Sequence, residues 1–304
     1  MQATSSLVLF LTLGIIAHAE DKPQTFQDSP VVTDGASLTL VTEGFKFTEG
    51  PARDAQGDVY FTDQPNDRIH RWEASSGKVS LFLEPCGRSN GLYFASDGSL
   101  LACADEKNEL WRIDPKTKTH EVLLGKYDGK LFNGPNDVWT LPNGDLYFTD
   151  PFYKRPYWNR GDREQDGQHV YFLKKGSKEA TRVVSDLKQP NGIVGNAKGD
   201  RLYVADIGDG KTYHFDIAKG GTLTNKTKLA DLGSDGMTLD EAGNLYLTGK
   251  GVTVFDPAGK KIEHIPVPEN WTANVCFAGK DRKTLFITAM DSVYTIPMKV
   301  VGEK

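Results

Sequence analysis

The stretch Asn133–Asp150 reads NGPNDVWTLPNGDLYFTD, which is the pattern of one β-hairpin. A polar residue, Asn136, stands at the start of a short apolar run. Gly144 follows eight positions later, where a tight turn needs a residue that tolerates a positive φ. An alternating strand then runs from Asp145 to Thr149. We call Asn136 the entrance residue of this hairpin, because it precedes the first strand.

The same pattern occurs six times along the chain. The six entrance residues, all acids or amides, are Glu49, Asn90, Asn136, Asn191, Asp235 and Asn274. The steps between them are 41, 46, 55, 44 and 39 residues. Five copies have a turn glycine eight positions after the entrance residue, and the sixth copy has none. A repeat of about 40–50 residues with several short strands is typical of a β-propeller blade.

Further strands between the hairpins bring each repeat to about four, as Glu109–Asp114 and His120–Leu124 do in the second copy. We therefore predict an all-β fold: a six-bladed β-propeller with four-stranded antiparallel blades, in one domain over residues 20–304. Because a propeller must join its first and last blades, the alternating run Ser37–Thr42 should add the outer strand to the blade built by Ser292–Met298. The first strand of each blade lines the central channel, so the six entrance residues should converge at one end of it.

Residues 1–19 predict a secretory signal peptide. Leu7–Ile16 is apolar, and Ala17, His18 and Ala19 form the small-x-small pattern that precedes cleavage, here after Ala19. The apolar run is too short for a membrane span. We expect a secreted or periplasmic protein with no membrane association after signal cleavage. An N-terminal anchor is the alternative, because the first six residues carry no Lys or Arg.

The formal net charge of −5, without a cluster of Lys or Arg, argues against nucleic acid as a partner. A small molecule is the partner we expect. Of the three cysteines, Cys86 and Cys103 could pair, and Cys276 lies in an apolar run that suggests a buried thiol. No CxxC spacing is present, so a thiolate metal site is not expected.

The longest step, 55 residues, contains an irregular segment, Pro151–Gln168, that reads PFYKRPYWNRGDREQDGQ. Long irregular loops in compact domains are often functional. If this loop covers the channel mouth, its aromatic residues would form walls for a ligand and two cations would contact an anion. These aromatic residues are Phe152, Tyr153, Tyr157 and Trp158, and the cations are Lys154 and Arg155. The alternative is a solvated loop whose aromatic side chains pack on their own blade.

Two carboxylates and four amides at equivalent positions suit a hard divalent cation, with Ca²⁺ as the first candidate and Mg²⁺, Mn²⁺ and Zn²⁺ left open. The absence of His and Cys from the ring argues against a tetrahedral zinc site. Alternatively, the Asn-Gly and Asp-Gly pairs are only turn formers. The separate turn glycine already explains each hairpin, which favours the metal.

Five strings, TEGP, GPNDV, YFTDP, QPNGI and SDGM, occur in this order. As an ordered set they resemble the SMP-30/gluconolactonase/LRE-like (luciferin-regenerating-enzyme-like) family of six-bladed propellers, over residues 40–298. The resemblance implies a divalent cation on the propeller axis, held by Glu49, Asn136, Asn191 and Asp235. It also implies a hydrolase, because relatives in that family include lactonases, phosphotriesterase-like hydrolases and, more distantly, strictosidine synthase-like proteins.

These features lead to the hypothesis of a calcium-dependent lactonase that opens sugar lactones. The cation would polarise the carbonyl, and Asp235 would activate water or attack directly as a nucleophile. The predicted substrate contacts are Arg88, Asn90, Asn136, Phe152, Tyr157 and Trp158. A surface salt bridge is the alternative role of Arg88, and Asp150 is a second candidate base whose other role is a turn cap. Alternative functions are an organophosphate or ester hydrolase at the same site, and a binding propeller with a structural metal.

Overall fold

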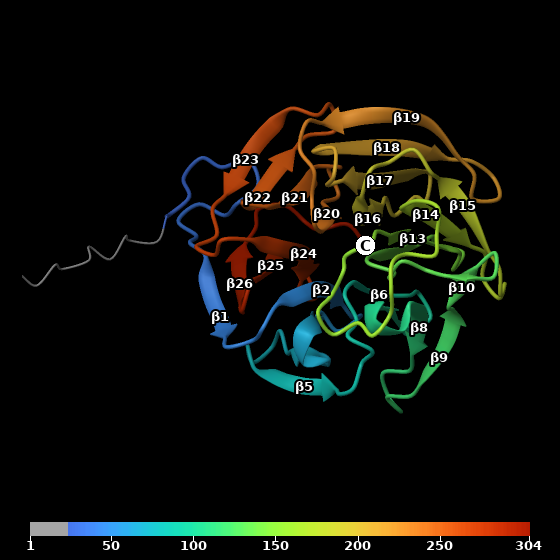
Figure 1. Ribbon diagram of the computed structural model, residues 1–304. Helices are drawn as coiled ribbons and strands as arrows, with labels where there is room; N and C mark the ends of the chain where they lie inside the picture. The colour runs from blue at the N-terminus through green and yellow to red at the C-terminus, as the bar shows by residue number, and fades with distance from the viewer. Residues whose placement is uncertain (1–23) are drawn as a thin grey trace, which may run out of the picture.

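The computed structural model describes residues 24–304 and forms a ring of six sheets around a central axis (Figure 1). Each sheet has four antiparallel strands, which confirms the predicted six-bladed β-propeller. A two-stranded hairpin, β10 (Lys126–Tyr127) and β11 (Lys130–Leu131), follows the second blade. The predicted signal peptide lies outside the described residues. Over residues 24–304, no helix is long and apolar enough to cross a bilayer.

Five blades follow one another along the chain, each numbered from the axis outward. Blade one contains β2 (Thr48–Arg53), β3 (Val59–Asp63), β4 (Arg68–Trp72) and β5 (Val79–Leu83). Blade two contains β6 (Leu92–Phe94), β7 (Leu100–Ala104), β8 (Glu109–Ile113) and β9 (His120–Leu124). Blade three contains β12 (Val138–Thr140), β13 (Leu146–Asp150), β14 (His169–Leu173) and β15 (Ala180–Val184). Blade four contains β16 (Pro190–Gly195), β17 (Arg201–Asp206), β18 (Lys211–Ile217) and β19 (Leu223–Ala230). Blade five contains β20 (Met237–Leu239), β21 (Leu245–Gly249), β22 (Gly251–Phe255) and β23 (Lys261–Ile265).

The sixth blade closes the ring with a strand from the other end of the chain. It contains β24 (Thr272–Ala278), β25 (Thr284–Ala289), β26 (Ser292–Pro297) and, outermost, β1 (Thr39–Glu43). The pairing of β1 with β26, from Thr39 opposite Thr295 to Glu43 opposite Ser292, confirms the predicted closure (Figure 1). Two short 3₁₀ turns, η1 (Gln64–Asn66) and η2 (Asp105–Lys107), follow the second strands of blades one and two.

The hydrophobic core lies between neighbouring blades. One cluster joins Trp139 and Tyr147 of blade three to Leu202 and Val204 of blade four, so each sheet covers a face of the next. The second strands are therefore buried on both sides, as β13 is along its whole length. Cys86, Cys103 and Cys276 are all free thiols, so the Cys86–Cys103 pair left open by the sequence does not form.

Glycines play two roles in the repeat. The turn glycines have a positive φ, +88° at Gly144, as the hairpin prediction requires. The glycine after the entrance residue serves close packing instead. A Cβ at Gly91 would lie 2.5 Å from Asp137 Oδ1, and one at Gly192 would lie 2.7 Å from the carbonyl oxygen of Asp235. These glycines therefore let the innermost strands of successive blades approach one another, and the turn-former interpretation of the Asn-Gly pairs is wrong here.

Aspartates that end a second strand hold the approach to the innermost strand of the same blade. Asp63 accepts the backbone N–H groups of Lys46 and Phe47, at 3.0 and 3.2 Å. Asp206 accepts those of Lys188 and Gln189, at 2.9 and 2.8 Å. Asp150 does the same in blade three, with both hydrogen bonds at 2.9 Å. Asp150 is therefore a backbone cap.

Candidate functional site

A cavity of about 240 Å³ opens at one end of the propeller axis. Its lining combines four entrance residues with side chains from the loops around them: Phe47, Glu49, Asn90, Asn136, Tyr153, Arg155, Ile207, Asp235 and Trp271. This volume is below the range of about 300–1,000 Å³ for drug-sized ligand sites, so the cavity suits a small molecule. A larger hollow of about 940 Å³ lies over blades one and two, but it is open and contains no entrance residue.

Hydrogen bonds tie the entrance residues to one another around the axis. Asn191 Nδ2 donates to Asp235 Oδ1 at 2.8 Å, and Trp271 Nε1 donates to Asp235 Oδ2 at 2.7 Å. Asn274 Nδ2 lies 3.4 Å from Glu49 Oε2. Together with the cavity lining, these contacts bring all six entrance residues to one place, although they come from six different blades.

The carboxyl groups at the axis are held in an environment that disfavours their charge. Burial raises the pKa of Glu49 well above its usual value, and the nearby Asp235 raises it further. Burial also raises the pKa of Asp235, although hydrogen bonds from Trp271 and Asn191 oppose the shift. Burial raises the pKa of Asp137, beside Asn136, to about 7. These carboxylates are short of positive charge.

The residues present fit a hard divalent cation. Glu49 and Asp235 would balance a charge of 2+, and the amides of Asn136 and Asn191 would supply further oxygen ligands. Among residues 24–304, neither Glu49 Oε1 nor the side-chain amide of Asn136 has a hydrogen-bond partner, so both are available as ligands. No group of three or more His, Cys, Asp or Glu side chains in the same range is placed to hold a metal. The donor set is therefore two carboxylates plus amides, which suits Ca²⁺ better than Zn²⁺.

The comparison with known families gives this site a context. Residues 47–291 match the SMP-30/Gluconolactonase/LRE-like region. The chain belongs to this family. A gluconolactonase from Zymomonas mobilis is 26% identical over 294 residues, covering 87% of this chain and 82% of that protein.

Solved structures of family members have the same fold. A gluconolactonase from Xanthomonas campestris superposes with a TM-score of 0.82 at 27% identity, covering 91% of this chain and 96% of that chain. Regucalcin from Agrobacterium tumefaciens, described as a calcium-binding protein, gives a TM-score of 0.74 at 20% identity, covering 88% of this chain and 96% of that chain. At that identity the second likeness concerns the fold alone.

The loop Pro151–Gln168 reaches the axis, but only part of it lines the cavity. Tyr153 and Arg155 contribute to the lining, whereas the predicted substrate contacts Phe152, Tyr157 and Trp158 do not. Phe152 and Trp158 pack on each other with ring centroids 5.7 Å apart. Tyr157 donates to Asp105 at 3.1 Å. In the structure these three residues hold the loop in place, and direct contact with a substrate stays a prediction for them.

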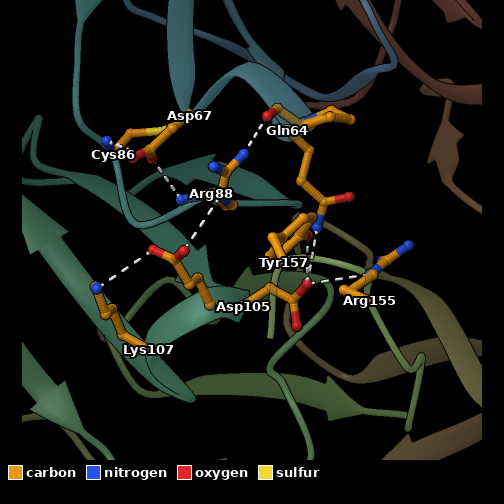
Figure 2. Close-up of polar contacts among 10 residues, drawn as sticks. Gln64, Asp67, Cys86, Arg88, Asp105, Lys107, Arg155 and Tyr157 are labelled. Carbon is orange, nitrogen blue, oxygen red and sulfur yellow. Dashed lines mark hydrogen bonds and ion pairs between the residues drawn. The ribbon is translucent and has the colours of Figure 1, made fainter. Parts of the chain in front are cut away.

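Arg88, another predicted substrate contact, lies outside the cavity lining (Figure 2). Its Nε is 3.2 Å from Glu106 Oε1, its Nη1 donates to the carbonyl of Pro65, and its guanidinium lies 4.5 Å from the ring centre of Tyr157. The ion pair agrees with the salt-bridge alternative. Asn90, two residues later, does line the cavity.

Four functional candidates escaped the sequence analysis: Phe47, Asp137, Ile207 and Trp271. Asp137 had a signal, because it stands where four other copies have glycine. Trp271 precedes the sixth copy, whose missing turn glycine drew attention away from it. Phe47 and Ile207 lie outside the repeat pattern that was aligned, so only the packing around the axis reveals them.

Proposed function

We propose that this chain is a lactonase that hydrolyses the ester bond of a small sugar lactone. A divalent cation, most plausibly Ca²⁺, would be held by Glu49, Asn136, Asn191 and Asp235. The observation that carries the proposal is the convergence of two desolvated carboxylates and unpartnered amides in one axial cavity. The gluconolactonases of Zymomonas mobilis and Xanthomonas campestris support the substrate class, and the calcium-binding regucalcin of Agrobacterium tumefaciens supports the ion.

Asp235 is the residue that we place against the reacting atoms. Trp271 and Asn191 each donate to one of its oxygens and fix its orientation, and its raised pKa makes it a better proton acceptor than an exposed aspartate. Asp235 takes a proton from the water that attacks the carbonyl carbon. The acyl C–O bond of the ring then breaks, and the ring oxygen leaves as a hydroxyl group on the resulting acid. A bound cation would supply polarisation of the carbonyl oxygen.

The first test follows ring opening with a pH indicator, using the protein as purified, after treatment with a chelator, and after calcium is restored. A panel of D-glucono-1,5-lactone, an aryl ester and a phosphotriester covers the competing reactions. We expect the lactone to be opened fastest, the rate to fall with chelator and to recover with Ca²⁺. Recovery with Mg²⁺ or Mn²⁺ but not Ca²⁺ would reassign the ion.

Two results would contradict the proposal. Faster turnover of the phosphotriester than of the lactone would make the chain an organophosphate hydrolase. No turnover of any compound, together with a melting temperature that still rises with calcium, would make it a binding propeller with a structural metal.

A further inference from the structure

Arg155 brings a positive charge to a cavity that the strands make acidic. It belongs to the cavity lining, and its guanidinium centre lies 5.0 Å from the ring centre of Tyr153. Its Nε donates to Asp105 Oδ2 at 3.1 Å. Over residues 24–304, neither of its terminal nitrogens has a hydrogen-bond partner. The neighbouring Lys154 is exposed and does not line the cavity.

The free end of this guanidinium matches a carboxylate. Its two terminal nitrogens can donate two parallel hydrogen bonds to the two oxygens of one carboxylate, while Nε stays on Asp105. The other polar lining residues, Glu49, Asn90, Asn136 and Asp235, are acids and amides and carry no positive charge. In the lining, Arg155 is therefore the cationic group that an anionic ligand would meet.

Asp105 departs from the pattern of the other blades in a way that serves Arg155. Asp63, Asp150 and Asp206 cap backbone N–H groups, but in blade two Asp67 does this, accepting from Cys86 and Arg88 at 2.9 and 2.7 Å. Asp105, which directly follows β7, is thereby released. Its buried carboxylate accepts from side chains instead, as Figure 2 shows. The three donors to its Oδ2 are Gln64 at 3.0 Å, Arg155 at 3.1 Å and Tyr157 at 3.1 Å.

This arrangement fixes Arg155 from two sides. Gln64 belongs to blade one and Asp105 to blade two, whereas Arg155 and Tyr157 belong to the loop after blade three. The far end of the Arg155 guanidinium points away from Asp105 in Figure 2. A buried carboxylate that pairs with one edge of the guanidinium leaves the opposite edge preorganised for a ligand.

We propose that Arg155 binds the carboxylate of a sugar acid in the axial cavity, and that Asp105 is its positioning residue. The inference rests on the proposed function, because opening a lactone creates a carboxylate in this cavity. Two ligands present the same group: the opened product, and a lactone that already carries a second acid group. In either case the loop supplies the charge recognition that the six repeats lack.

The test compares two ligands that differ only at one end, D-gluconate and D-glucitol, by calorimetric titration of the calcium-loaded protein. We expect Arg155→Ala to weaken gluconate binding about 10- to 100-fold and to leave glucitol binding unchanged, because only the charged hydrogen bonds are lost. Arg155→Lys should fall between, since it keeps the charge without the fork. Lys154→Ala is the matched control and should bind gluconate as the wild type does.

Kinetics separate the two sources of the carboxylate. If the opened product is the ligand, Arg155→Ala weakens inhibition by gluconate and leaves KM for D-glucono-1,5-lactone unchanged. If a second acid group is the ligand, KM rises about tenfold or more for a glucarolactone only. Either result supports the proposal. Binding is measured without turnover, so an inactive protein that still binds gluconate through Arg155 would refute the lactonase and keep this inference.

The role of Asp105 is tested by a double-mutant cycle. Asp105→Asn should weaken gluconate binding several-fold in the wild type and have no further effect in Arg155→Ala, because it acts through that residue. A structural role would weaken both backgrounds equally. The proposal is overturned if the wild type does not prefer gluconate to glucitol, or if Arg155→Ala binds gluconate as the wild type does or loses both ligands equally.

Discussion

Asp235 offers the most direct test at the scale of one residue. Asp235→Asn keeps the shape of the side chain and a hydrogen bond to Trp271 but removes the charge that binds a cation and accepts a proton. We expect kcat for lactone opening to fall at least about 100-fold, the range for loss of a general base. The circular-dichroism spectrum should not change. Asp231→Asn is a suitable control, because Asp231 pairs with Lys228 on the surface. Full activity in Asp235→Asn would remove Asp235 from the mechanism.

Asp105 should leave a signature in the pH dependence of stability. Burial raises its pKa from 3.8 to about 6, with Arg155 and Tyr157 opposing the shift. The folded state therefore holds the proton more tightly than the unfolded state, and the associated stability is lost as pH rises from about 4 through 6. The loss is on the order of 3 kcal/mol. In urea unfolding, Asp105→Asn should therefore gain on the wild type between pH 4.5 and 7.5. A pH-independent difference between the two proteins would contradict the shift.

At the scale of the element, the caps at the ends of second strands hold the approach to the axis. Asp150→Ala would leave two buried N–H groups, of Asn133 and Gly134, without an acceptor. Each such group costs about 1–3 kcal/mol. We expect the free energy of unfolding in urea to drop by about 2–5 kcal/mol.

Asp97→Ala is the control for the cap, because Asp97 accepts the exposed N–H of Ser99, which water can replace. Its effect should stay within about 0.5 kcal/mol. Equal effects of the two substitutions would show that the cap adds nothing beyond a surface turn.

At the scale of the whole molecule, the ring depends on β1. Removing residues 1–44 would leave β26 as an open edge and would expose the core around Phe26, Val31 and Val32. Each of these side chains contributes about 1.5–3 kcal/mol by burial. We therefore expect a melting temperature lowered by more than about 10 °C, or an insoluble product. Removal of residues 1–23 alone keeps every described contact and serves as the control, with an expected melting temperature equal to that of the full chain.

The repeat was readable from the sequence because its cause is local. A turn glycine with a positive φ and an alternating strand recur at nearly constant spacing, which determines the blades and their number. The same alignment placed Glu49, Asn191 and Asp235 at one level of the channel, since equivalent positions of a closed ring must meet. The closure by residues 37–42 followed from the same geometry.

The orientation of side chains around the cavity was decided only by the tertiary structure. The loop Pro151–Gln168 has no repeat to align, so the sequence could not show that Arg155 faces the axis while Lys154 faces solvent. Nor could it show that Asp67 takes over the capping in blade two and frees Asp105 for Arg155. Periodic residues obtain their positions from the backbone pattern that they share. The partners of a solitary loop residue are instead selected by packing against segments far away in the chain.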